Sequence, residues 1–192
     1  MRNRTSGLIL VLALGTAGCA ADVDEQQTSK PPTSSEVQVA PSTESQIYAA
    51  VLRRLVLTDH TFGVGDPSPF KAVYVIDHRS SGISDSFFLA GGAAPLDESI
   101  QSEIERQSEE LPLIEFIDTR ESRIDPGGQG LTGVVNDGVV VGLSAISTRD
   151  DGAVEVGAGF WCGVDCGFGT TYLVENSDGW HVTENIGPTS IS

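Results

Sequence analysis

The sequence predicts an α+β fold in which two helices pack on a curved, mainly antiparallel sheet of about five to six strands. Two segments, near residues 43–56 and 97–111, carry apolar side chains at three- and four-residue spacing, as amphipathic helices do. After residue 112 short β-rich runs alternate with turn residues. A helix, a strand, a second helix and then a strand meander is typical of helices packed on one face of a sheet.

The first helix begins at Thr43-Glu44-Ser45-Gln46, which has the form of a capping box. Arg53 and Arg54 are expected on its solvent side. The residues expected to face inward share one helical stripe: Ile47, Tyr48, Val51, Leu52, Leu55 and Val56.

One strand separates the two helices. Residues 72–76 follow the breaker Pro67-Ser68-Pro69 and are rich in β-branched and aromatic side chains. A Gly/Ser-rich loop is expected over residues 80–95, and Asp97 is expected to cap the second helix, which ends before Pro112. The inward residues of that helix are Ile100, Ile104 and Leu111.

The rest of the chain is predicted to be strands, with runs at residues 113–119, 131–135, 139–146, 154–161, 171–175 and 180–183. Asn136-Asp137-Gly138 predicts a hairpin between residues 131–135 and 139–146. Two further turns are expected at 150–152 and at 176–179. The aromatic residues Trp161, Trp180, Phe160 and Tyr172 are expected in the sheet core rather than in a ligand platform.

The first 18 residues have the layout of a secretory signal peptide. Arg2 and Arg4 precede an apolar run, Leu8 to Leu14, and small residues follow it. The run is about half the roughly 20 residues that a membrane-spanning helix needs. We therefore expect residues 1–18 to direct export.

Thr16-Ala17-Gly18-Cys19 resembles the lipobox of bacterial lipoproteins, although the family favours Leu where Thr16 stands. The resemblance implies cleavage before Cys19 and lipidation of its sulfur, with acyl chains such as palmitate holding the protein on the extracytoplasmic side of a membrane. A plain signal peptide cut near Ala20 or Ala21, and hence a secreted protein, is the alternative.

Residues 19–42 are polar, contain three prolines and show no apolar periodicity. Such a segment buries too little apolar surface to offset its ordering entropy, so we expect a disordered tether. Residues 43–192 are then a single globular domain.

The chain carries 27 acidic and 11 basic side chains, a formal charge of −16. Cleavage before Cys19 removes only basic charges and makes the mature chain more acidic. A polyanion such as nucleic acid is repelled by this charge, so nucleic acid is excluded as a partner.

The closing segment Tyr172-Leu173-Val174-Glu175…Asp178-Gly179-Trp180-His181-Val182, together with the order of elements before it, is similar to NTF2-like and cystatin-like domains. The resemblance covers most of residues 45–185. It implies a curved sheet that encloses a pocket, used in that superfamily either for catalysis or for binding, and it carries over no catalytic residue.

Cys162 and Cys166 lie four positions apart among glycines. In an exported protein this spacing favours a disulfide, with modest stabilisation because the closed loop is short. A redox pair or half of a metal site are the alternatives; Asp165 between the cysteines would raise their thiol pKa, which disfavours the redox alternative.

Three histidines are candidates for acid–base chemistry, and two of them follow an aspartate: Asp59-His60 and Asp77-His78. Because adjacent strand residues point to opposite faces, Asp77 is expected to be badly placed to orient His78. His60 and His78 are the candidate pocket residues, and His181 beside Trp180 is expected to be exposed.

Other motifs are weak. Gly142-Leu143-Ser144 lacks the second glycine of a nucleophile elbow, and no helix follows Gly127-Gly128-Gln129-Gly130 to receive a phosphate. Asp118, Glu121 and Asp125 match no calcium-loop spacing. We therefore predict no catalytic residue, no metal ligand set and no cofactor.

These observations favour a lipid-anchored domain that binds a protein partner or a small ligand without catalysis. A small pocket enzyme of hydrolase or isomerase type, using His60 or His78, is the first alternative. An inhibitor or immunity-type lipoprotein, presenting the loop at residues 80–95, is the second.

Overall fold

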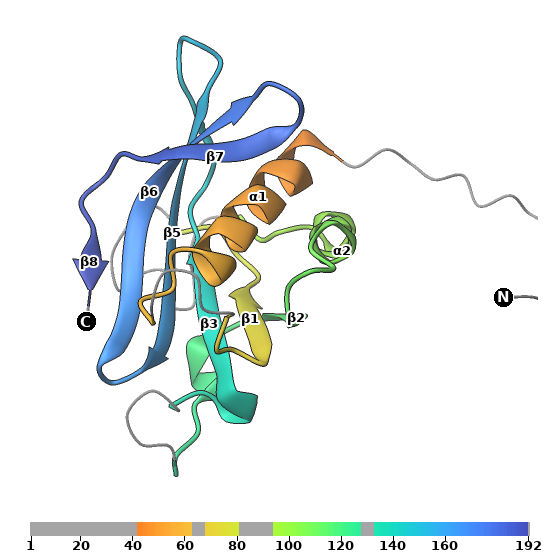
Figure 1. The fold of residues 1–192 in the computed structure, drawn as a ribbon. Coiled ribbons are helices and arrows are strands. Elements are labelled where there is room, and N and C mark those ends of the chain that lie inside the picture. Colours follow the sequence, from red (N-terminus) through yellow and green to blue (C-terminus); the bar gives the residue numbers. More distant parts are fainter. Residues whose placement is uncertain (1–41, 63–67, 81–93, 128–132, 192) are drawn as a thin grey trace, which may run out of the picture. The chain divides into compact units, whose positions relative to one another are not determined.

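Eight strands form one mixed, open sheet, and the two helices pack against it (Figure 1). The computed structural model describes residues 42–62, 68–80, 94–127 and 133–191, all within one compact unit, Val39–Ser192. The predicted α+β class, with two helices on a mainly antiparallel sheet, is confirmed. Six strands make the main path of the sheet, and two strands of two residues each lie beside it.

The main path runs β2-β1-β3-β5-β6-β7. The strands are β1 (Ala72–Ile76), β2 (Leu113–Ile117), β3 (Gly138–Leu143), β5 (Val154–Gly163), β6 (Cys166–Asn176) and β7 (Trp180–Asn185). The short β4 (Ser147–Thr148) pairs with β5, and the short β8 (Ser190–Ile191) pairs with β6. Strand β1 is parallel to both of its neighbours, β2 and β3, whereas the pairs from β3 to β7 are antiparallel.

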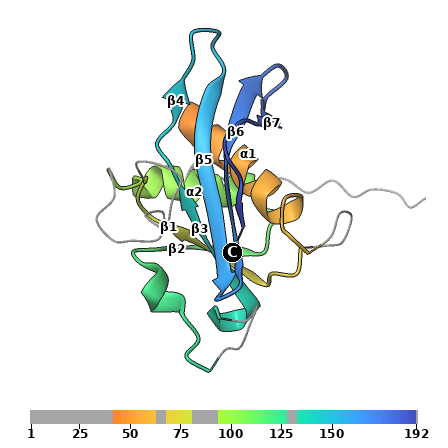
Figure 2. The same cartoon turned by 90° about the vertical axis from the view of Figure 1, so that its left-hand side faces the viewer.

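Both helices, α1 (Thr43–Leu57) and α2 (Glu98–Gln107), lie on one face of the sheet, behind β5 and β6 in Figure 2. The predicted inward stripe of α1, from Ile47 to Val56, is buried. It packs in one core cluster with the alternate residues of the strands, among them Val73, Val141, Val156 and Phe160. This cluster is the main core of the domain.

A second, smaller cluster covers the opposite face of β1 and β3. Tyr74 and Val140 pack there with Val134, and Trp161 lies at its border. Arg123 stacks over the Tyr74 ring and Arg120 over the Trp161 ring, each 5.1 Å from the ring centroid. The segment after β2 thus covers the second face of the sheet, in agreement with the burial of every residue of β1 and β3.

The helix ends differ in detail from the prediction. The N-cap of α1 is Ser42, one residue before the expected box, and its hydroxyl accepts a hydrogen bond from the Ser45 N–H at 3.2 Å. Asp97 is the N-cap of α2, but its side chain makes no capping hydrogen bond. Helix α2 ends at Gln107, earlier than Pro112, although Leu111 still reaches the core.

The predicted hairpin at Asn136-Asp137-Gly138 is wrong. Asn136 and Asp137 adopt the left-handed backbone that such turns need, with φ of 59° and 50°. Among the described residues, however, β3 pairs with β1 and β5, while Val134 pairs with Ile124. A strand buried on both faces is stabilised most in the middle of the sheet, so burial overrode the local turn signal.

The closing hairpin is confirmed, since β6 and β7 pair antiparallel around residues 177–179. The turn at 150–152 joins β4 to β5. The described helices include none that is both long and apolar enough to cross a membrane.

Candidate functional site

A groove of about 610 Å³ lies between the first half of α1 and the end of the sheet formed by β4, β5 and β7. Its size falls within the range of about 300–1,000 Å³ that is usual for small-molecule sites. Its lining mixes apolar and polar side chains: Thr43, Glu44, Ile47, Arg79, Ala145, Ile146, Thr148, Gly152, Val154 and Trp180. Four separate regions of the chain therefore meet around this groove.

An ion pair joins two of these regions. The Nε of Arg79 donates to Oε1 of Glu44 at 2.9 Å, and its Nη2 also contacts that oxygen. Nη1 donates to the carbonyl oxygens of Ala94 and Pro95, at 3.2 and 2.7 Å. The two side chains are only 15% and 31% exposed, so the pair is partly shielded from water. Within the groove the two charges neutralise each other.

Tyr48 lies beneath this pair in the core. Its hydroxyl donates to the carbonyl oxygen of Ser144 at 3.0 Å. Burial raises the pKa of Tyr48 to about 12, partly offset by the nearby Arg79 guanidinium. Burial alone would lower the pKa of Arg79, but hydrogen bonds to Glu44 and Tyr48 outweigh it and raise that pKa above its ordinary value. Arg79 is therefore held as a cation.

Trp180, the first residue of β7, lines the groove and also a second hollow of about 350 Å³ beside it. The second hollow is lined by Gln46, Arg53, Gln107, Ser177, Asp178, Gly179, Trp180 and His181. Trp180 is partly buried and packs against the main core, as expected, but it also lines both hollows. Phe160 and Tyr172, by contrast, are fully buried.

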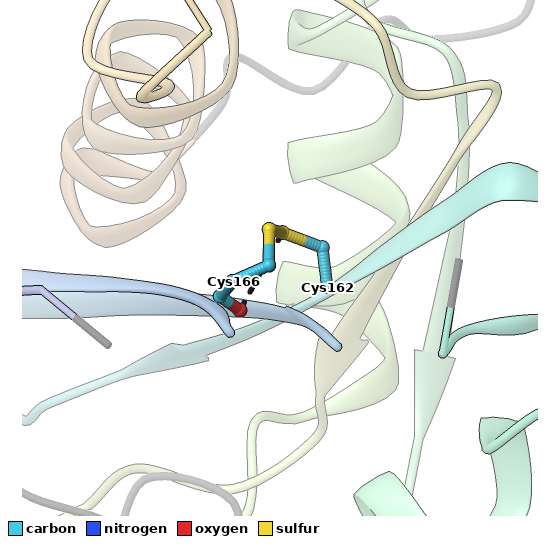
Figure 3. Close-up of a disulfide and its surroundings, with 2 residues drawn as sticks. All are labelled: Cys162 and Cys166. Carbon is cyan, nitrogen blue, oxygen red and sulfur yellow. Dashed lines mark hydrogen bonds between the residues drawn. A yellow bond between two sulfur atoms is a disulfide. The ribbon is translucent and has the colours of Figure 1, made fainter. Parts of the chain in front are cut away.

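Cys162 and Cys166 are joined by a disulfide across the ends of β5 and β6, with a Cα–Cα distance of 5.1 Å (Figure 3). Both cysteines are buried in the main core. The turn between them carries the exposed Val164 and Asp165. Because β5 runs antiparallel to β3, this turn lies at the end of the sheet where β3 begins. The last residue of β3, Leu143, lies toward the opposite end. The disulfide thus links the ends of β5 and β6, and neither cysteine lines the groove.

His60 is 5% exposed, and its Nδ1 has no hydrogen-bond partner in the described part of the chain. Its ring lies 6.2 Å from that of Phe62. The neighbouring Asp59 does not serve it, because the Asp59 carboxylate accepts hydrogen bonds from Arg54 and Tyr172, at 2.9 and 3.0 Å. The environment of His60 is therefore that of a buried core residue.

His78 is 7% exposed, and its Nδ1 lies 3.2 Å from Oδ1 of Asp77. The expectation that Asp77 is badly placed for His78 is therefore wrong. Strand β1 ends at Ile76, so the alternation of faces no longer applies to the next two residues. Neither His60 nor His78 is among the described residues that line the two hollows. The third histidine, His181, is exposed and lines the second hollow.

Asp118 joins this pair. In the described ranges, Asp77, His78 and Asp118 form a group whose potential ligand atoms all lie within 4.8 Å of one another. Glu121 pairs instead with Arg120, and the Asp125 side chain accepts from the Gly127 N–H. Sequence reasoning missed the group because Asp77 and Asp118 are 41 positions apart. The available signal was that each carboxylate directly follows a β-rich run.

Several predicted features lie outside the described residues: the signal peptide, Cys19, the tether up to residue 41, most of the loop at 80–95, and Gly128-Gln129-Gly130. No protein-family model matches this chain, and neither the curated proteins nor the solved structures compared with it include a match.

Proposed function

We propose that this chain is an extracytoplasmic lipoprotein, attached to a membrane through lipid on Cys19, whose globular domain binds a small ligand without catalysis. The observation that carries the proposal is the groove between α1 and the β4–β5 and β7 end of the sheet. Its volume suits a molecule of drug-like size. The order of signal peptide, polar tether and domain supports a binding protein held near a membrane surface.

The lining indicates the class of ligand. Trp180, Ile47, Ile146 and Val154 offer apolar surface, and Thr43 and Thr148 offer hydroxyl groups. The charged lining residues, Glu44 and Arg79, already pair with each other. Desolvating an unpaired charge is costly, so a groove whose charges are balanced favours a ligand without net charge. We therefore assign the groove to a neutral, partly apolar small molecule.

A fluorescent probe tests this assignment. N-phenyl-1-naphthylamine is neutral and apolar, and its emission rises when it enters an apolar site. We expect the Cys19→Ala chain, which carries no lipid, to bind the probe, and Trp180→Ala to weaken binding at least tenfold. Leu113→Ala is the matched control, because Leu113 is 73% exposed on β2, outside the groove lining. Equal binding by the Trp180→Ala and Leu113→Ala variants would reject the groove as the site.

A small enzyme of hydrolase or isomerase type is the second candidate, favoured by the contact between His78 and Asp77, although His78 is not among the described residues that line the two hollows. A carboxylate that orients an imidazole is the arrangement of many general-base sites. Hydrolysis of p-nitrophenyl acetate that is lost in His78→Gln but kept in His181→Gln would favour the enzyme over the binding domain.

A further inference from the structure

We propose that Asp77, His78 and Asp118 bind a divalent transition-metal ion, with Zn²⁺ as the best match. This site lies outside the groove lining and does not depend on the proposed function. It differs from a surface patch of carboxylates because one of its three members is a nine-tenths buried imidazole.

The fold brings the two carboxylates together. Strands β1 and β2 are parallel, and their last residues, Ile76 and Ile117, are paired in register. Asp77 and Asp118 each come next, and the Asp77 N–H donates to the Ile117 carbonyl oxygen at 2.9 Å. The ligand atoms of Asp77 and Asp118 consequently lie within 4.8 Å of each other.

The backbone around the site is fixed on both sides of His78. The Leu96 N–H donates to the Asp77 carbonyl oxygen at 2.7 Å, and His78 forms a β-bridge with Pro95. Two residues on, the Ser80 N–H donates to the Leu143 carbonyl oxygen at 2.8 Å. A ligand set held by a rigid backbone loses little conformational entropy when a metal binds.

The charges favour a dication. Two carboxylates within 4.8 Å of each other repel, and a bound dication removes that repulsion and leaves the group neutral.

The set of ligand atoms distinguishes Zn²⁺ from Ca²⁺ and Mg²⁺. Ca²⁺ and Mg²⁺ prefer oxygen ligands alone, whereas an imidazole nitrogen with two carboxylate oxygens suits Zn²⁺. Zn²⁺ sites with three protein ligands complete their coordination with water. Around a tetrahedral ion, ligand atoms at about 2.0–2.2 Å from the metal are about 3.4 Å apart. Asp118 is exposed, so its carboxylate can rotate to close the remaining gap.

The test is calorimetric titration of the full Cys19→Ala chain with Zn²⁺ in metal-free buffer. The Cys19→Ala change also removes the one cysteine outside the disulfide as a competing ligand. We expect one ion per chain, and at least tenfold weaker binding in both His78→Gln and Asp118→Asn. Because Asp118 is exposed, Asp118→Asn is expected to fold even if His78→Gln does not.

Two controls separate this site from diffuse attraction of cations to an acidic protein. Asp165→Asn removes one exposed carboxylate at the opposite end of the strands, and His181→Gln removes an exposed imidazole. Both variants are expected to bind Zn²⁺ as the parent chain does. No saturable binding by the parent chain, unchanged binding in Asp118→Asn, or Ca²⁺ binding as tight as Zn²⁺ binding would each overturn the proposal.

Discussion

The guanidinium of Arg79 binds the carboxylate of Glu44, with Nε and Oε1 2.9 Å apart, although the two residues are 35 positions apart. The contact connects the segment that follows β1 with the first turn of α1, and both residues line the groove. Shape and charge balance of the groove therefore depend on one partly buried ion pair.

Replacing the cation tests that dependence. Arg79→Met keeps the aliphatic part of the side chain but removes the side-chain donor of Glu44 and of the Pro95 carbonyl oxygen. We expect urea denaturation to show a loss of about 1–3 kcal/mol in the free energy of unfolding. Arg149→Met, which removes an exposed ion pair with Glu155, is the control and should cost less than about 1 kcal/mol. Equal losses in the two variants would contradict the role given to Arg79.

Alkaline pH should destabilise the domain through two tyrosines. Burial raises the pKa of Tyr48 to about 12, and burial together with the Asp59 charge raises the pKa of Tyr172. In the unfolded chain both phenols lose their protons near pH 10. Since the folded pKa values are raised, the stability they contribute is complete below pH 10 and is lost as the pH rises from about 10 toward 12 and beyond.

Each of these tyrosines is expected to lower the free energy of unfolding by up to about 1.4 kcal/mol per pH unit in that range. Urea midpoints between pH 9 and pH 12 measure the effect. Tyr172→Phe should show a shallower alkaline loss than the parent chain, and a slope that is the same in both proteins would count against this explanation.

The disulfide should contribute modestly. Cys162 and Cys166 close a loop of only five residues, for which the chain-entropy model gives about 2 kcal/mol. Reduction with dithiothreitol is expected to lower the free energy of unfolding by that amount. The Cys162→Ala, Cys166→Ala double variant should not respond to the reductant, and a response in that variant would show that reduction acts elsewhere.

Membrane attachment depends on one sulfur atom if the lipobox-like segment is processed. Cys19→Ala should move the protein from the membrane fraction to the soluble fraction, since acyl chains supply the membrane affinity. Fractionation followed by immunoblotting measures this, with Cys162→Ala as the cysteine control. Continued membrane association of the Cys19→Ala chain would disprove the lipid anchor.

Much of the fold was predictable from local patterns. The stripe from Ile47 to Val56, the β-rich run at 72–76 and the turn before Trp180 each depend on near neighbours in sequence. The two parallel pairs of β1 were not predictable in this way, because strand partners are chosen by burial across the whole sheet. The failed hairpin at Asn136 and Asp137 has the same cause.

The candidate sites were less predictable. Glu44, Arg79 and Trp180 belong to no binding or catalytic motif in the sequence, and they meet only because α1 crosses the end of the sheet near β7. Asp77 and Asp118 meet because two strand ends are in register. Such sites follow from tertiary pairing, whereas the disulfide followed from residues four positions apart.

The most direct test of the ligand-binding proposal is an NMR titration of the ¹⁵N-labelled Cys19→Ala chain with N-phenyl-1-naphthylamine. The account predicts saturable shift changes at the amides of Glu44, Ile47, Thr148 and the Trp180 backbone and indole. Shift changes confined to other surfaces, such as Leu113 on β2 or Val164 beside the disulfide, or no saturable change at all, would contradict it.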